Sequence, residues 1–139
     1  MTQQHIDAVQ RTFKTIEPEA EGAMMLFYAR LFELDPGLQP MFQASREEQA
    51  KKLAQVLGVV VKSLDRLETI LPAVRDLGSR HHGYGVKNEH YATVGAALLW
   101  TLEQALGEAF TPEVKEGWTT AYGTLAAVMQ DAAAAAATA

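Results

Sequence analysis

The chain of 139 residues is 48% hydrophobic and 21% charged and has a formal net charge of −5, which fits one globular domain and excludes a disordered or collagen-like chain. No basic cluster is larger than Lys51 and Lys52, which argues against nucleic acid or an anionic membrane as a partner and favours a small ligand. Cysteine is absent, which excludes disulfides, thiolate-bound zinc, iron–sulfur clusters and covalent attachment of a prosthetic group through a CxxCH motif. Any metal must therefore be held by histidine or carboxylate.

The N-terminal sequence MTQQHIDAVQ lacks the basic start and apolar centre of a secretion signal. No apolar run approaches the roughly 20 residues that cross a bilayer. We therefore expect a cytoplasmic protein without a membrane partner.

Apolar residues recur at helical spacing along almost the entire chain, and no segment shows the sustained alternation typical of strands. Residues with capping or helix-breaking chemistry interrupt this pattern at Pro18, Asp35 and Pro36, Ser45, Gly83 to Gly85, Gly107, and Thr111 and Pro112. The sequence predicts a single all-α domain over residues 1–139 with about seven helices.

Residues 27–42, FYARLFELDPGLQPMF, predict a helix that carries Tyr28, followed by a turn at Asp35 and Pro36 towards Phe42. Apolar residues three and four positions further on place Tyr28 on an apolar face. A buried phenol needs a hydrogen-bond partner. Tyr28 is therefore either a core residue with its hydroxyl at the rim or a donor to a ligand.

A capping-box pattern, Ser45 followed by Glu48, predicts the start of a long helix. One face of this helix begins with a polar residue and continues with apolar ones: Gln49, Leu53, Val56, Leu57 and Val60. Gln49 is then either a half-exposed boundary residue or a contact to a ligand.

The following apolar face leads to a histidine. It comprises Leu67, Ile70, Leu71, Val74 and Leu77, and His81 is the next position on it. His82 lies about 100° further round the helix, so we expect His81 to point inward and His82 to face solvent. Periodicity alone leaves an ordinary core histidine open as the alternative.

Two further apolar stripes predict an antiparallel pair of helices near the end of the chain. The first contains Tyr91, Val94, Leu98, Leu102 and Ala105, and the second contains Val114, Trp118, Ala121, Tyr122, Leu125, Val128 and Met129. Residues 132–139 are mostly alanine without an apolar stripe, which is typical of a fraying helical tail.

In order and spacing these segments resemble single-domain bacterial haemoglobins and the globin domain of flavohaemoglobins. The resemblance covers about residues 5–131. Its most specific parts are FYARLFELDPGLQPMF and SRHHGYGVKNEHY, residues 27–42 and 79–91. It implies a globin fold packed around a non-covalent haem b.

The resemblance also implies roles for individual residues. His81 would be the proximal iron ligand, Tyr28 the distal hydrogen-bond donor and Phe42 the aromatic residue on the porphyrin face. Gln49 and Leu53 match the distal glutamine and leucine of the family. The resemblance and the helical periodicity agree independently on His81.

Other residues are expected to line the haem or to hold its periphery. Val56 would exclude water on the distal side, and Arg80 would reach a propionate. The expected proximal lining is Leu77, Val86, Tyr91, Val94, and Trp118 or Tyr122.

One position departs from the flavohaemoglobin pattern. There the proximal histidine is grouped with a tyrosine, matched by Tyr91, and with a glutamate, whose position here is Ala133, with Asp131 the nearest carboxylate. A histidine that donates to a carboxylate is a stronger electron donor to its metal. We therefore expect weak peroxidase-like activity and, because no flavin reductase domain follows, dependence on a separate reductant.

Three classes of function fit the sequence. We favour reversible binding, storage or delivery of oxygen by a five-coordinate ferrous haem, with nitric oxide and carbon monoxide as further gas ligands. The alternative is a nitric oxide dioxygenase that depends on a separate reductase. The third is a gas sensor or a haem-free helical interaction module. The sequence leaves the oligomeric state open.

Overall fold

The computed structural model describes residues 1–42, 44–83 and 86–138, and every regular element in these ranges is helical. The all-α prediction is confirmed. In chain order the elements are α1 (Gln3–Ile16), η1 (Glu17–Glu19), α2 (Ala20–Leu34), η2 (Pro36–Met41), α3 (Arg46–Lys62), η3 (Leu64–Thr69), α4 (Leu71–Gly83), α5 (Asn88–Leu106), η4 (Gly107–Ala109) and α6 (Pro112–Thr138), where η marks a 3₁₀ helix.

Polar side chains cap the elements around the predicted turn at Asp35 and the predicted start at Ser45. The Ser45 hydroxyl accepts a hydrogen bond of 3.2 Å from the backbone N–H of Glu48. The Asp35 carboxylate accepts one of 3.1 Å from the N–H of Gly37 and so begins η2. Each bond satisfies an N–H that has no partner within its own helix. Both predicted boundaries are therefore confirmed.

Glycine ends α5. Gly107 has a φ of 55°, a left-handed conformation that glycine adopts without steric cost and that stops the helix. The other predicted glycine break, from Gly83 to Gly85, begins where α4 ends, but Tyr84 and Gly85 lie outside the described residues.

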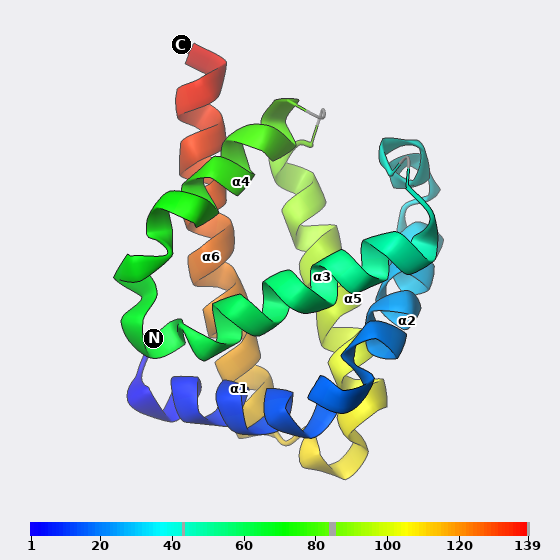
Figure 1. The fold of residues 1–139 in the computed structure, drawn as a ribbon, viewed down its shortest axis with the longest axis vertical. Coiled ribbons are helices and arrows are strands. Elements are labelled where there is room, and N and C mark those ends of the chain that lie inside the picture. The colour runs from blue at the N-terminus through cyan, green and yellow to red at the C-terminus, as the bar shows by residue number, and fades with distance from the viewer. Residues whose placement is uncertain (43, 84–85, 139) are drawn as a thin grey trace.

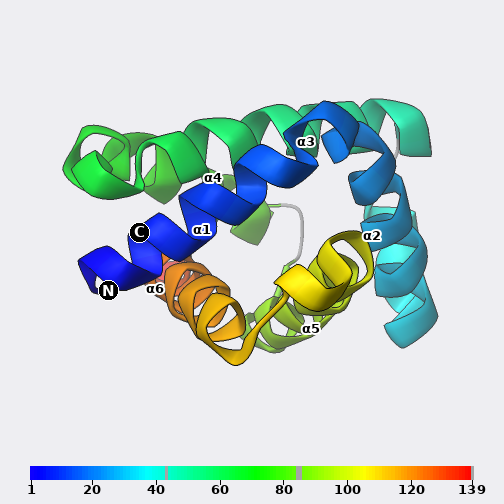
Figure 2. The same cartoon turned by 90° about the horizontal axis from the view of Figure 1, so that it is seen from below.

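Helix α6 is the centre of the packing. It makes its largest contacts with α4 and α1, whereas α5 packs mainly on α2. Figure 2 shows α3 and α4 on one side of the molecule and α5 and α6 on the other, and in Figure 1 α3 crosses in front of α5. The predicted pairing of the last two helices is thus a secondary contact rather than the main one.

Helices α4 and α6 approach closely because a glycine lies between them. A methyl group added to Gly78 would lie 2.6 Å from the Cα atom of Met129, well inside van der Waals contact. Gly78 is buried. The absence of a side chain at this position therefore fixes how α4, which carries His81, sits on α6.

The apolar run before His81 is not one continuous helix, which corrects the pattern expected from residue 67 onwards. Leu67 belongs to η3, and Arg66 within it has non-helical angles of φ −141° and ψ 49°. Pro72 is the second residue of α4, a position where proline needs no hydrogen bond from its nitrogen. From Leu71 onwards the helical register to His81 is as predicted.

The alanine-rich end continues α6 as far as Thr138. Ala133 is buried, whereas Ala134 to Ala136 are exposed. The first part of this segment therefore packs on the rest of the protein. In the described residues, no helix combines the length and apolarity needed to cross a membrane.

Candidate functional site

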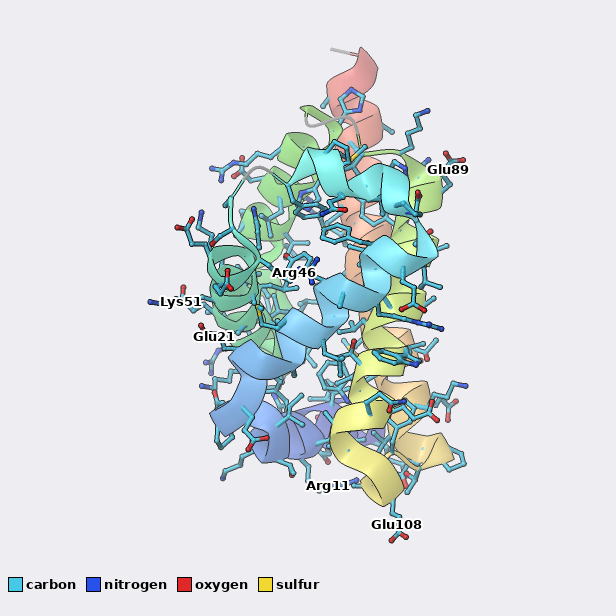
Figure 3. All side chains as sticks on the ribbon, turned by 90° about the vertical axis from the view of Figure 1, so that its right-hand side faces the viewer. Arg11, Glu21, Arg46, Lys51, Glu89 and Glu108 are labelled. Atoms are coloured by element: carbon cyan, nitrogen blue, oxygen red, sulfur yellow. The ribbon has the colours of Figure 1, made fainter. Side chains whose placement is uncertain are left out.

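Three predicted site residues meet at one pocket. Tyr28 from α2, Phe42 directly after η2 and Gln49 near the start of α3 all line a pocket of about 150 Å³. In Figures 1 and 3, η2 and the start of α3 lie on the same side of the molecule as the C-terminal end of α4, which carries His81. The other described lining residues are Phe32, Gln39, Ala44 and Arg46.

Aromatic rings hold Tyr28 in place. Its ring centroid lies 5.1 Å from that of Phe27, 6.0 Å from Phe32 and 5.3 Å from Phe42, and the residue is 6% exposed. Burial raises the pKa of the Tyr28 hydroxyl to about 12, because the phenolate would lose hydration. The hydroxyl is thus protonated at neutral pH, and in the described part of the chain it has no hydrogen-bond partner.

Apolar side chains on the predicted inner faces remain partly uncovered. Val56 is 42% exposed. Covering such side chains with an apolar group is favourable because it removes their surface from water. The predicted lining residues that are half-buried are Leu53 on α3, Leu77 on α4, Val86 before α5 and Val94 on α5.

The two adjacent histidines of α4 differ in burial as periodicity predicts. His81 is half-buried and His82 is exposed. The Nδ1 atom of His81 lies 2.6 Å from the backbone oxygen of Leu77. Since a carbonyl oxygen only accepts, Nδ1 carries the proton, and in the neutral ring Nε2 carries the lone pair that a metal requires.

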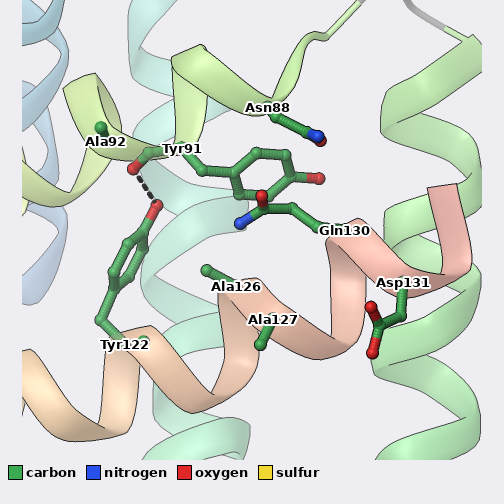
Figure 4. A pocket seen from close by; sticks show the side chains of 9 residues that line it. Asn88, Tyr91, Ala92, Tyr122, Ala126, Ala127, Gln130 and Asp131 are labelled. Carbon is green, nitrogen blue, oxygen red and sulfur yellow. Dashed lines mark hydrogen bonds between the residues drawn. The ribbon is translucent and has the colours of Figure 1, made fainter. Parts of the chain in front are cut away.

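Tyr91 and Tyr122 line a second pocket, of about 510 Å³, between the start of α5 and the C-terminal half of α6 (Figure 4). The Tyr122 hydroxyl donates a bond of 2.6 Å to the backbone oxygen of Tyr91. The Tyr91 hydroxyl is buried and has no partner among the described residues. Burial raises the pKa of both hydroxyls, so both are neutral at pH 7.

Position 133, where the resemblance to flavohaemoglobins implies a glutamate beside Tyr91, holds an alanine. Ala133 is buried, and Asp131 is exposed, although it lines the Tyr91 pocket. Figure 4 shows Gln130, Asn88 and Tyr91 together, with Asp131 set apart.

Two residues that were predicted to contact the haem, Trp118 and Arg80, contact other side chains. The Trp118 indole N–H donates a bond of 2.9 Å to the Thr12 hydroxyl, and both residues are buried between α1 and α6. Trp118 therefore belongs to the α1–α6 core. Arg80 is exposed and forms an ion pair of 2.9 Å with Asp76, one turn earlier on α4, so contact with a propionate would require it to exchange this partner.

Arg46 and Gln39 also line the Tyr28 pocket, although neither was predicted to be a site residue. Arg46 precedes Gln49 by three positions, a spacing that puts both on one side of a helix, and this was the available signal. Other charged side chains, including Lys51, Glu89 and Glu108, point away from the helices in Figure 3. The Arg46 guanidinium instead lies over the Phe32 ring, with its carbon 5.7 Å from the centroid.

The described residues form an all-helical fold with a half-buried histidine near the end of α4 and a pocket between α2 and α3. The family model for globins matches residues 25–129. The chain therefore belongs to the globin family.

Similar proteins agree with this membership. The chain is 32% identical to a flavohemoprotein from Vibrio cholerae over 134 residues, which is 94% of this chain and 34% of that protein. A flavohemoprotein from Bacillus subtilis is also 32% identical, over 87% of this chain and 31% of its own length. The chain thus spans about a third of these curated relatives. A bacterial globin from Campylobacter jejuni, at 27% identity, superposes with a TM-score of 0.88 over 99% of this chain and all of its own.

The residues of the site fit a haem, as family membership implies. The Nδ1 hydrogen bond to Leu77 makes Nε2 the nitrogen of His81 that a metal would bind. The half-buried apolar residues offer a surface that a flat apolar ring would cover, and the hydroxyl of the buried Tyr28 offers a donor. The chain is a haem globin.

Proposed function

We propose that this globin reversibly binds oxygen through a non-covalent haem b held by His81, with Tyr28 and Gln49 as donors to the gas. The observation that carries the proposal is the Tyr28 side chain, which is 6% exposed, keeps its hydroxyl protonated at neutral pH and shares a pocket with Gln49. The hydroxyl has no hydrogen-bond partner in the described ranges, so it is available to donate to a polar ligand in that pocket.

A ferrous haem with one imidazole ligand supplies one open coordination position for a diatomic gas. Tyr28 would donate its phenolic proton to a gas bound at this position, and the Gln49 amide would be a second, weaker donor. Both line one pocket, and a hydrogen bond inside a protein is stronger than in bulk solvent. Slow release of oxygen is the expected result.

Apolar side chains beside this pocket would support the haem. Phe42 packs edge-on against Tyr28, with an angle of 68° between the ring planes, and so restricts the orientation of the phenol. We assign Leu53 and Val56 to the distal surface. The proximal surface is assigned to Leu77, Val86, Tyr91, Val94 and Tyr122.

Absorption spectra of the purified protein in the ferric, ferrous and oxygen-equilibrated forms test the proposal. We expect a Soret band, a five-coordinate ferrous spectrum, and a reversible change on adding and removing oxygen. A protein with no Soret band would be a haem-free helical module. A ferrous haem that oxidises at once, without a reversible change, would contradict oxygen binding.

Nitric oxide dioxygenation is the second candidate, favoured by the similarity to flavohemoproteins. It requires electrons from a reductase, and the position that would carry a carboxylate beside Tyr91 is Ala133. Sustained nitrate formation from nitric oxide and oxygen, with an added flavin reductase and NADH, would establish it. A single turnover without further nitrate would favour oxygen binding.

A further inference from the structure

The outer part of the Tyr28 pocket carries a positive charge that gas binding does not use. We propose that Arg46 makes the mouth of this pocket a binding site for small monovalent oxyanions, of which nitrite is the probe. The inference deepens the proposed function, on which it rests, because the same pocket is assigned to the gas ligand.

The polar lining residues lie at increasing depth. Arg46 is exposed, Gln49 is half-buried and Tyr28 is buried. Arg46 is the first residue of α3, and its guanidinium is held over the Phe32 ring at 5.7 Å. Cation–π contact fixes the position of a side chain that would otherwise sample many rotamers.

The pocket is rich in donors. The Tyr28 hydroxyl, the Gln39 and Gln49 amides and the Arg46 guanidinium line it, and none of its described lining residues is acidic. Within the described ranges, none of these four side chains has a hydrogen-bond or ion-pair partner. Arginine presents a planar fork of N–H donors that pairs with two oxygens of one anion.

Size restricts the ligand. A pocket of about 150 Å³ has room for a three- or four-atom oxyanion, and such an ion is small enough to contact the guanidinium and an amide of the lining together.

The charge of the rest of the protein makes Arg46 necessary for anion binding. The net charge of −5 opposes the approach of an anion. Glu47 and Glu48 follow Arg46 in the first turn of α3, but neither lines the pocket. Lys51 is exposed on the same helix and also does not line it, which makes it a matched control for the loss of one positive charge.

The experiment compares the wild-type holoprotein with Arg46→Gln, Arg46→Lys and Lys51→Gln. Haem content is measured first, and nitrite is then titrated into the ferric forms while the Soret band is followed. We expect Arg46→Gln to weaken nitrite binding about ten-fold, Arg46→Lys to weaken it less, and Lys51→Gln to change it less than two-fold. Carbon monoxide, which is neutral, should bind all four ferrous proteins with similar rates.

The outcomes separate this inference from the proposed function. Equal nitrite affinity of wild type and Arg46→Gln, at equal haem content, would overturn the oxyanion site and leave oxygen binding intact. Equal losses in Arg46→Gln and Lys51→Gln would also overturn it, since they would show an effect of net charge alone. If the protein holds no haem, the proposed function fails, and nitrite titration followed by ¹⁵N NMR decides. Shifts of the Arg46 and Gln49 side-chain signals then support the site, and their absence overturns it.

Discussion

At the scale of single residues, the proton on Tyr28 determines what the pocket can do. Its pKa of about 12 lies above the ordinary tyrosine value of 10.0, so the hydroxyl remains a donor throughout the neutral range. Because this pKa is higher in the folded than in the unfolded state, the protonated hydroxyl contributes its full share to the stability below pH 10. That share of the stability is lost as the pH rises towards 12. Gas binding that depends on Tyr28 is therefore expected to be independent of pH between 6 and 9 as far as this residue is concerned.

Tyr28→Phe removes the hydroxyl and keeps the ring among its aromatic neighbours. Oxygen dissociation should become about ten-fold faster or more, since a polarised hydrogen bond is worth roughly 1.5 to 3 kcal/mol. Carbon monoxide is less polarised, so its dissociation should change much less. Stopped-flow ligand displacement measures both rates.

Thr12→Val is the control for this prediction, because it also removes a buried hydroxyl, but one that accepts a bond from the Trp118 indole in the α1–α6 core. It should lower the melting temperature without changing the oxygen rate. If Tyr28→Phe instead lowers the melting temperature and leaves oxygen dissociation within two-fold of wild type, Tyr28 is a core residue and the distal mechanism is wrong.

The two histidines of α4 provide a second test. His81→Ala should give a helical protein with little haem, because the inward imidazole is the proposed ligand. His82→Ala should keep normal haem content, since His82 is exposed. The measurement is haem per chain after purification, and equal retention by both variants would refute the assignment of His81.

Burial could be predicted where the periodicity of a single helix determines it. Contacts between residues of two different helices could not be predicted. The burial of His81 relative to His82 follows from 3.6-residue periodicity alone. Trp118 lies on an apolar stripe too, but the stripe does not reveal that Thr12, 106 positions away, is its partner. Arg46 could not be assigned because its contact with Phe32 depends on how α2 and α3 cross.

At the scale of elements, the close packing of α4 on α6 depends on Gly78. Gly78→Ala should lower the stability by about 1 to 3 kcal/mol, the usual cost of overpacking, because the new methyl group would overlap the Met129 backbone. Haem content should fall with it, since α4 carries His81. Thermal unfolding and haem per chain are the measurements.

Gly83→Ala is the matched control at the other end of α4. Among the described residues, no atom lies within 4 Å of a methyl group at this position, so alanine should leave the stability unchanged or slightly raise it through its better helix propensity. Equal effects of the two substitutions would show that contact with Met129 does not determine the position of α4.

The break between α3 and α4 could not be predicted from the sequence. Residues 63–70 contain neither glycine nor proline, and their apolar spacing continues that of a helix. The structure nevertheless forms η3 there, with Arg66 outside helical angles. Such a bend is determined by the packing of α3 and α4 on different neighbours, which local propensity does not contain.

At the scale of the whole molecule, the haem contributes to the stability of the fold. Ligand at about a thousand times its dissociation constant stabilises the native state by roughly 4 kcal/mol, which for a chain of this size raises the melting temperature by about 10 °C. Thermal unfolding of the apo and holo forms tests this. An apo form that melts within a degree or two of the holo form would show that the partly exposed apolar surface does not need the haem.

The hydrogen bond between Trp118 and Thr12 joins the last helix to the first. During synthesis, α1 leaves the ribosome long before α6 does, and it lacks its largest packing partner until α6 follows. Contacts with such a large separation along the chain form late and slow folding. The globin core is therefore completed after translation of α6, and until then the nascent chain exposes the surface that a chaperone would bind.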